Sequence, residues 1–299
     1  MLCCFLCSFW LPLQAAQLAL VLSSEEGPYR EFAGALKGAI SGGIWQIVWI
    51  GSSEAYAQAA PAGIDLVVAA GSPATRVALQ NAAGPPVIAT LLTRASFEQI
   101  RAESPAFRNG VTALYLDQPL QRQVAFIARL LPDTRRLVTV VSDKLADQLP
   151  LLKREAAARQ MTLDAAVLAD SDNLVPVLER MLARDAVFLA LPDSNIFARD
   201  NIRPFLLTTY RYQRPVIAFS APFVQAGALA ALYTTPAQLA LELGQMLMRL
   251  SPGNLALPPP RSPTRFSVLF NAQVARALKL TLPGEDEILA TLNVQGGEK

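Results

Sequence analysis

Hydroxyl and carboxylate side chains follow short apolar runs at several points of this sequence, where they could bind a small polar molecule. They are Ser23 and Ser24, Ser72 with Pro73, Thr90 and Thr93, Ser142 and Asp143, Asp193 and Ser194, and Ser220. Each apolar run is typical of a strand, and Ser, Thr and Asp are preferred helix N-caps, so capping alone explains any one of them. Their recurrence at successive strand ends predicts a ligand site, because ligands of open α/β sheets bind beyond the carboxyl ends of strands.

The chemistry that this set predicts is binding by hydrogen bonds, with the carboxylate of Asp193 facing a cationic group. The sequence contains no histidine. This absence excludes Ser-His-Asp and Cys-His catalysis, histidine zinc sites and the usual general base near neutral pH. No motif predicts a cofactor or a metal, so we expect neither. The predicted ligand is small and polar or zwitterionic.

The stretch DLVVAAGSPATRVALQ shows how one such strand end is built. Residues 66–70 have no polar face, which suits a parallel strand covered on both sides. Gly71 permits a sharp turn, Ser72 is the expected N-cap, and Pro73 is the expected first helical residue. The turn would leave backbone N–H groups directed at whatever lies above the strand end.

Apolar runs alternate with amphipathic helical segments along the chain, in pairs of about 25–30 residues, as in repeated βαβ units. This alternation begins again near residues 115–119, which divides the chain into two halves. The segments after residue 226 cross between the two halves again. The predicted fold is therefore α/β, with two Rossmann-like lobes that contain parallel sheets and are joined by multiple crossovers. Multiple crossovers imply a hinge with a cleft between the lobes.

The expected division of the chain is as follows. Residues 17–114 with about 232–262 form the first lobe, residues 115–231 with about 263–285 form the second, and residues 286–299 are a C-terminal tail. We expect a monomer. The balance of 26 basic and 24 acidic residues, with no long basic run, argues against a nucleic-acid partner.

Residues 1–16, MLCCFLCSFWLPLQAA, are apolar and end in small residues. They are typical of a secretory signal peptide cleaved near Ala16, since they are short for a membrane span. The alternative is a retained membrane anchor. No lipoprotein pattern precedes any of the three cysteines, so we expect a periplasmic protein without a lipid anchor.

Several segments resemble the ABC-transporter substrate-binding proteins of the tryptophan/tyrosine-binding type, over residues 18–283. They are LALVLSSEEGPYREFAGALKGAI, DLVVAAGSPATRVALQ, DAVFLALPDSNIFA, RPVIAFSAPFVQAGALAALYTTPAQLALELGQM and RFSVLFNAQVARALKLTLP. The order and spacing of these segments are more specific than any one of them. The resemblance implies a type I periplasmic binding protein fold and a receptor that closes on a small ligand and delivers it to a membrane permease.

The resemblance also implies a set of ligand-contacting positions, to which the strand-end pattern adds Thr93. The positions are Ser23, Ser24, Ser72, Pro73, Ser142, Asp193 and Ser220. The chain departs from the family pattern at Leu92-Thr93-Arg94, where a Ser/Thr-Asp-Pro-like turn is common. An aromatic amino acid is therefore not implied as the ligand.

Two other hypotheses remain open. A binding protein that serves a membrane sensor would need the same fold and pocket. An α/β enzyme is disfavoured by the absence of histidine, of G-x-G-x-x-G and of G-x-x-x-x-G-K-[ST].

Overall fold

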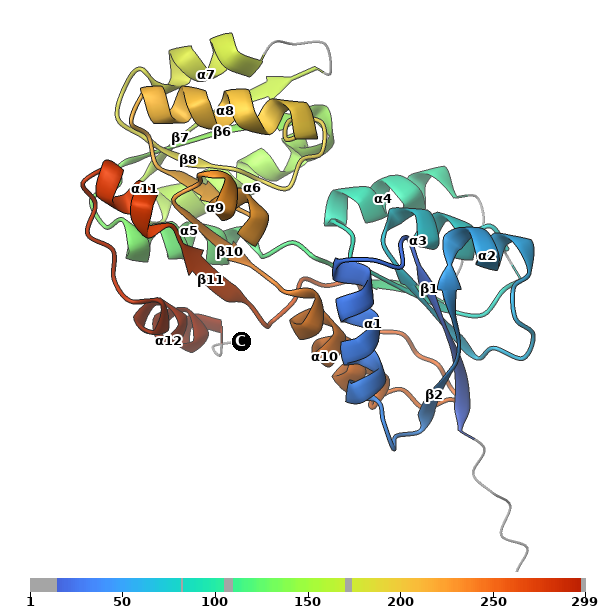
Figure 1. Ribbon diagram of the computed structural model, residues 1–299. Coiled ribbons are helices and arrows are strands. Elements are labelled where there is room, and N and C mark those ends of the chain that lie inside the picture. The colour runs from blue at the N-terminus through green and yellow to red at the C-terminus, as the bar shows by residue number, and fades with distance from the viewer. Residues whose placement is uncertain (1–14, 82, 105–109, 170–173, 297–299) are drawn as a thin grey trace, which may run out of the picture.

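The computed structural model describes residues 15–81, 83–104, 110–169 and 174–296. The chain forms two α/β lobes that lie side by side, with the connecting segments between them (Figure 1). Each lobe has its own sheet and its own buried apolar core, as the alternation of apolar runs and helices predicts.

The first lobe contains a five-stranded parallel sheet in the order β2-β1-β3-β4-β5. Its strands are β1 (Ala16–Leu22), β2 (Trp45–Ser52), β3 (Leu66–Ala70), β4 (Val87–Thr90) and β5 (Val111–Leu114). The helices that follow the first four strands are α1 (Pro28–Ala39), α2 (Ser53–Gln58), α3 (Ser72–Ala78) and α4 (Arg94–Glu103). All five residues of β3 are buried, because helices cover both faces of the sheet.

The second lobe contains a six-stranded sheet in the order β11-β10-β9-β8-β6-β7, in which β11 alone is antiparallel. Its strands are β6 (Arg136–Ser142), β7 (Thr162–Leu168), β8 (Val187–Leu189), β9 (Val216–Ala218), β10 (Ala230–Tyr233) and β11 (Ser267–Phe270). The helices around it are α5 (Leu120–Leu130), the 3-10 helix η1 (Asp143–Gln148), α6 (Leu149–Ala157), α7 (Leu174–Leu182), α8 (Arg199–Arg211), α9 (Ala221–Ala226) and α11 (Ala272–Ala277).

The chain passes between the lobes three times. The first crossover runs from β5 to α5, and the second runs from β10 to α10 (Pro236–Leu247), which packs against α1 in the first lobe. The third returns through residues 258–266 to β11. Leu239 and Leu243 of α10 complete the core of the first lobe. Thr235 and Gln238 begin α10 with a capping box.

Two expectations differ from the structure. The sequence of residues 144–160 predicts one helix, but η1 precedes α6 there, and Pro150 lies in the first turn of α6, where a missing N–H is tolerated. The segment expected as a C-terminal tail contains helix α12 (Glu285–Gly296), whose Ile288 and Leu292 are buried in the core of the second lobe. The helix belongs to that lobe because these two residues, four apart, present one apolar face.

Candidate ligand-binding site

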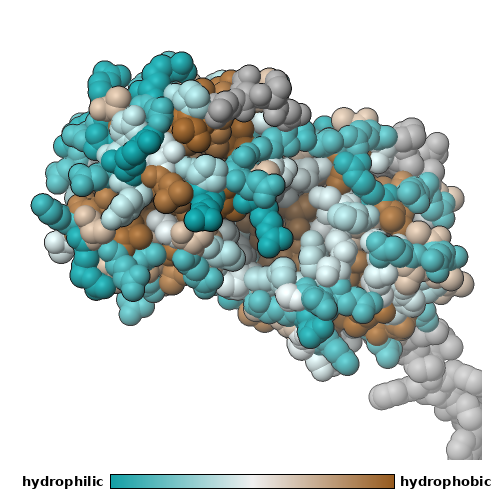
Figure 2. Space-filling view, turned by 45° about the horizontal axis from the view of Figure 1, so that its top comes forward, coloured by the Kyte–Doolittle hydropathy of each residue, from teal (hydrophilic) through white to brown (hydrophobic). Residues whose placement is uncertain are grey.

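The predicted polar residues follow the carboxyl ends of parallel strands in both sheets, and an ion pair joins these edges of the two lobes. Arg94, the first residue of α4, follows the fourth strand of the first lobe, and Asp147 lies in η1 after β6 of the second lobe. Arg94 Nη2 and Asp147 Oδ2 are 3.0 Å apart. This interlobe ion pair places the two strand edges on opposite sides of one opening, and apolar surface lies in the hollow between the lobes (Figure 2).

Ser23 organises the turn at the end of β3. Its hydroxyl donates to the carbonyl of Ala70 (2.8 Å) and accepts from the backbone N–H of Ala74 (3.1 Å). The N-cap of α3 is Gly71 and not Ser72, so the predicted cap is wrong by one residue. Gly71 has no side chain to cap the helix, and Ser23 supplies the missing acceptor from the neighbouring strand.

Gly71 is required by space as well as by conformation. Its φ is +93°, and a Cβ on it would lie 2.5 Å from Ser23 Oγ and 2.8 Å from Tyr29 Oη. Two polar side chains therefore close over the turn, and the close approach leaves no room for a side chain at this position.

The other predicted residues of the first lobe lie around this edge. Ser24 is exposed and accepts from the N–H of Glu26 (3.3 Å), and Pro73 is also exposed. Ser72 is partly buried at the first position of α3. Thr93 is partly buried and caps α4 by accepting from the N–H of Ser96 (3.1 Å).

In the second lobe, Asp193 is buried and holds two strand ends together. One carboxylate oxygen accepts from the N–H of Ser142 (2.7 Å), and the other accepts from the N–H groups of Asn195 (3.0 Å) and Ile196 (3.4 Å). The carboxylate is therefore occupied by backbone donors of its own lobe. This geometry joins the end of β6 to the turn after β8, a positioning role that the sequence analysis did not assign.

The hydroxyl of Ser142 is buried and has no hydrogen-bond partner among the described residues. The same holds for Thr90 Oγ1, at the end of β4 in the first lobe. Ser220 is the partly buried N-cap residue of α9, and its side chain makes no capping hydrogen bond. Strand ends in both lobes thus present hydroxyls that capping does not use.

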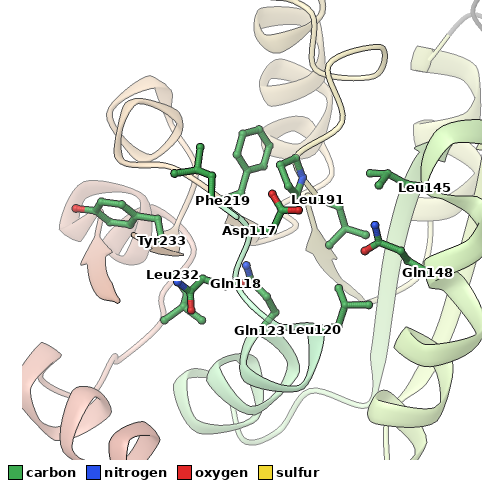
Figure 3. A pocket seen from close by; sticks show the side chains of 12 residues that line it. Asp117, Gln118, Leu120, Gln123, Leu145, Gln148, Leu191, Phe219, Leu232 and Tyr233 are labelled. Atoms are coloured by element: carbon green, nitrogen blue, oxygen red, sulfur yellow. The ribbon is translucent and has the colours of Figure 1, made fainter. Parts of the chain in front are cut away.

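A pocket opens where the first crossover meets the second lobe (Figure 3). Its walls are mainly apolar, and its polar groups come from the crossover, from α5, from η1 and from the end of β10. The lining residues are Leu116, Asp117, Gln118, Leu120, Gln123, Leu145, Gln148, Leu191, Pro192, Phe219, Leu232 and Tyr233. A largely apolar concavity with a few convergent polar groups is the usual form of a small-molecule site.

Asp117 is the central polar group of this pocket (Figure 3). Its Oδ2 accepts from the backbone N–H of Arg94 (2.7 Å), while Oδ1 is buried with no partner among the described residues. Burial raises the pKa of the Asp117 carboxyl to about 7, against the weaker opposing effects of the Arg94 N–H and of the Arg94 charge. An unpaired buried carboxylate oxygen favours a ligand that donates a hydrogen bond.

Gln123, on α5, offers a second open acceptor. Its side chain is buried, and Oε1 has no hydrogen-bond partner among the described residues. Phe219 contributes an apolar surface. The centre of its ring lies 5.8 Å from that of Phe197 and 5.5 Å from that of Phe223. The pocket therefore combines hydrogen-bond acceptors with a rigid aromatic wall.

Sequence patterns alone do not single out Asp117 or Gln123 as site residues. Asp117 lies in the segment identified as the join between the halves, and a charged residue in a crossover was a signal that could have been used. Gln123 lies among Leu120, Val124 and Ile127 on the apolar face of an amphipathic helix. A polar residue on such a face predicts a buried polar group.

Hydrogen bonds tie the three crossovers together beside the pocket. Gln118 Nε2 donates to Thr234 Oγ1, and Thr234 Oγ1 donates to the carbonyl of Arg265 (2.9 Å). Arg122 donates to Gln118 Oε1 (2.6 Å) and to the carbonyl of Pro263 (3.0 Å). These hydrogen bonds join one segment from each of the three crossovers, so the crossovers form one connected hinge between the lobes.

In the described ranges, no helix combines the length and hydropathy needed to cross a membrane. Nor do the described residues include a cluster of three or more Asp, Glu, Cys or His side chains suited to a metal ion.

Comparison with known proteins bears on this arrangement. Residues 52–292 match the family described as "ABC transporter substrate binding protein". No match is found among curated protein sequences.

Solved structures resemble the whole chain at low sequence identity. A ligand-free, open substrate-binding protein with adhesive properties from Clostridium difficile is 13% identical, with a TM-score of 0.70 over 91% of this chain and 97% of that one. An ABC domain in complex with L-Trp from Streptococcus pneumonia is 16% identical, with a TM-score of 0.63 over 91% and 98%. A substrate-binding protein from Desulfitobacterium hafniense in complex with Leu is 14% identical, with a TM-score of 0.51 over 88% of each chain.

Proposed function

Because the chain belongs to the ABC transporter substrate-binding protein family and has the type I periplasmic binding protein fold, we propose that it is the solute-binding component of an ABC-type uptake system. In this proposal a small polar or zwitterionic, amino-acid-like ligand binds in the interlobe cleft, and the lobes close on it about the hinge. The complexes of two similar structures with L-Trp and with Leu support an amino-acid-like ligand. The observation that carries the proposal is the pocket at the hinge, whose open acceptors have an apolar surround.

The proposed ligand contacts come from both strand edges and from the hinge. They are Ser24, Ser72, Pro73 and Thr93 of the first lobe, Ser142 and Ser220 of the second, and Asp117 and Gln123 at the hinge. Ser23 and Asp193 are proposed to position these groups, because their polar atoms already bind backbone groups of the turns on which the contacts lie.

The proposed partner is the membrane permease of the same system, and the proposed state in solution is a monomer. The proposed location is the periplasm, with residues 1–16 as the signal peptide. The described residues begin at Ala15, so residues 1–14 lie outside them. Family and fold are those of substrate-binding proteins, which supports binding without turnover.

The test is a thermal-shift screen of the purified protein against amino acids, amines, nucleosides, small sugars and organic acids, followed by small-angle X-ray scattering. A ligand at 100 times its Kd should add about 2.7 kcal/mol to the free energy of unfolding. The same ligand should reduce the radius of gyration, because closure brings the lobes together. The absence of stabilisation by every class would contradict the proposal, as would chemical conversion of the ligand.

A further inference from the structure

Within the described part of the chain, the hinge pocket is lined by an acidic side chain and by no basic one. Of its twelve lining residues, Asp117 is the charged one, and neither Lys nor Arg is among them. A site built to hold a zwitterion would place a cation or a set of free donors within reach of the ligand carboxylate. The charged group that lines this pocket is a carboxylate.

The polar side-chain atoms of the lining that are buried and have no hydrogen-bond partner among the described residues are acceptors. Asp117 Oδ1 and Gln123 Oε1 are both buried and have no donor among the described residues. Gln118 also lines the pocket, but its amide donates to Thr234 and its carbonyl oxygen accepts from Arg122. Asp117 Oδ1 and Gln123 Oε1 therefore require N–H or O–H donors from a ligand.

Two arginines near these acceptors, Arg94 and Arg122, are engaged elsewhere. The guanidinium of Arg94 pairs with Asp147 at 3.0 Å, and only its backbone N–H reaches Asp117. Arg122 binds Gln118 and the carbonyl of Pro263, and its guanidinium lies 4.7 Å from the ring centre of Phe266. Neither guanidinium neutralises Asp117 Oδ1 by a hydrogen bond.

The apolar side chains of the pocket require a ligand with an apolar body. Phe219, Leu191 and Leu232 lie around Asp117 without a polar atom in their side chains (Figure 3). Phe219 is also held by ring contacts with Phe197 and Phe223, so this wall is preformed. A ligand that fills the pocket must carry an apolar body next to its donor group.

We propose that the hinge pocket recognises a protonated amine, whose N–H groups bind Asp117 Oδ1 and Gln123 Oε1 while an apolar body packs on Phe219 and Leu191. The ligand class is a primary amine with a hydrocarbon or aromatic body, and a carboxylate is not needed for binding. This inference rests on the proposed function and narrows its ligand, because the amine is the part of an amino-acid-like molecule that the pocket selects.

The experiment compares three probes that share one apolar body: phenethylamine, phenylalanine and 3-phenylpropanoate. Isothermal titration calorimetry with the full-length protein at pH 8 gives a Kd for each, and a thermal-shift panel of other primary amines, their amino acids and their acids extends the comparison. We expect amines to bind at least as tightly as the matched amino acids, and the acids to show no binding. The opposite order, with an amino acid more than tenfold tighter than its amine, would overturn the inference.

The variant Asp117→Asn tests the contact itself. It keeps the size of the side chain and an oxygen that can accept from the Arg94 N–H, and we expect it to weaken amine binding by at least tenfold. Asp133→Asn is the matched control, because Asp133 is exposed at the other end of the second lobe and loses the same charge. Equal amine affinity in Asp117→Asn, Asp133→Asn and the parent protein would contradict the inference.

Failure of this inference and failure of the proposed function give different results. If amino acids, sugars or acids stabilise the protein and no amine does, the solute-binding function holds and the amine preference is wrong. If no compound of any class binds, both are wrong. Circular dichroism of each variant before titration separates loss of binding from loss of folding.

Discussion

Arg94 and Asp147 form an ion pair that joins α4 of the first lobe to η1 of the second, with Nη2 and Oδ2 3.0 Å apart. Both side chains are about half exposed, at 46% and 62%. A pair this exposed contributes about 0–1 kcal/mol, so its importance lies in where it is. It bridges the two lobes, while the backbone N–H of the same Arg94 binds Asp117 at the hinge.

Replacing Asp147 with Asn should change the lobe separation and leave stability almost untouched. We expect a broader interlobe distance distribution in double electron–electron resonance, with spin labels on exposed positions of α2 and α7. The free energy of unfolding should change by less than about 1 kcal/mol. Addition of 1 M NaCl to the parent protein should reproduce the broadening, since the Debye length is then about 3 Å. An unchanged distribution would show that the pair does not restrain the lobes.

Replacing Asp117 with Asn should stabilise the ligand-free protein at high pH. The pKa of Asp117 in the folded protein is raised to about 7, above the value of about 3.9 in an unfolded chain. The folded state therefore binds more protons than the unfolded state between these values, and stability falls as pH rises through this window. The gain from Asp117→Asn should be near zero at pH 4 and reach about 1–3 kcal/mol at pH 8, the usual penalty for a buried unpaired polar group.

Urea denaturation at pH 4, 6 and 8 measures this gain. The charged and titratable groups that act on Asp117 or are acted on by it are Arg94 on α4 and Tyr115 on the same crossover. Tyr115 does not titrate in this range, because burial raises its pKa to about 12. A gain that is the same at all three pH values would contradict the assignment to Asp117.

Gly71→Ala should destabilise the protein more than Gly63→Ala. Both glycines have positive φ, at +93° and +71°, so each substitution strains the backbone by about 1 kcal/mol. At Gly63 the new Cβ would meet Gln17 at an ordinary 3.6 Å, whereas at Gly71 it would lie 2.5 Å from Ser23 Oγ. We therefore expect a further loss of about 1–3 kcal/mol at Gly71, measured by thermal unfolding. Ser23→Ala in the Gly71→Ala background should recover part of that further loss, and no recovery would contradict the clash.

Asp193→Ala should lower stability, because three backbone N–H groups lose their acceptor. Hydrogen bonds to a charged group are worth about 1.5–3 kcal/mol each, and relaxation of the turn will offset part of the sum, so we expect a loss of about 2–4 kcal/mol. Asp193→Asn should lose less, because its amide oxygen can still accept. Asp143→Asn, at an exposed position of the same lobe, is the control. A loss below about 0.5 kcal/mol in Asp193→Ala, measured by urea denaturation, would exclude the positioning role.

Much of the fold is predictable because its signals are local. Residues 66–70 have no polar face and form a fully buried parallel strand, as their sequence predicts. The apolar periodicity of α12 is equally local: Ile288 and Leu292 are four apart, directly after an acidic first turn. This pattern is enough to predict a helix at the end of the chain.

The candidate site depends on contacts that local patterns do not report. Asp193 is followed by a turn that reads as a helix start, but its function depends on the N–H of Ser142, 51 residues away. Likewise, Ser23 caps a helix 51 residues further on, so Ser72 was assigned a role that a distant residue fulfils. Asp117 lines a pocket only because residues of the second lobe pack around it. The sequence around Asp117 predicts a crossover between the lobes but no pocket.

The position of α10 has a consequence for how the protein folds. The indole N–H of Trp45, at the start of β2, donates to the carbonyl of Leu247 at the end of α10, 202 residues later. Neither lobe is a continuous stretch of chain, so the first cannot bury Phe32 and Leu36 until a segment made after most of the second has arrived. A chain cut at residue 119 would leave that apolar surface open. The lobes have separate sheets and cores but should unfold together, in one transition, with the slow kinetics of a topology rich in distant contacts.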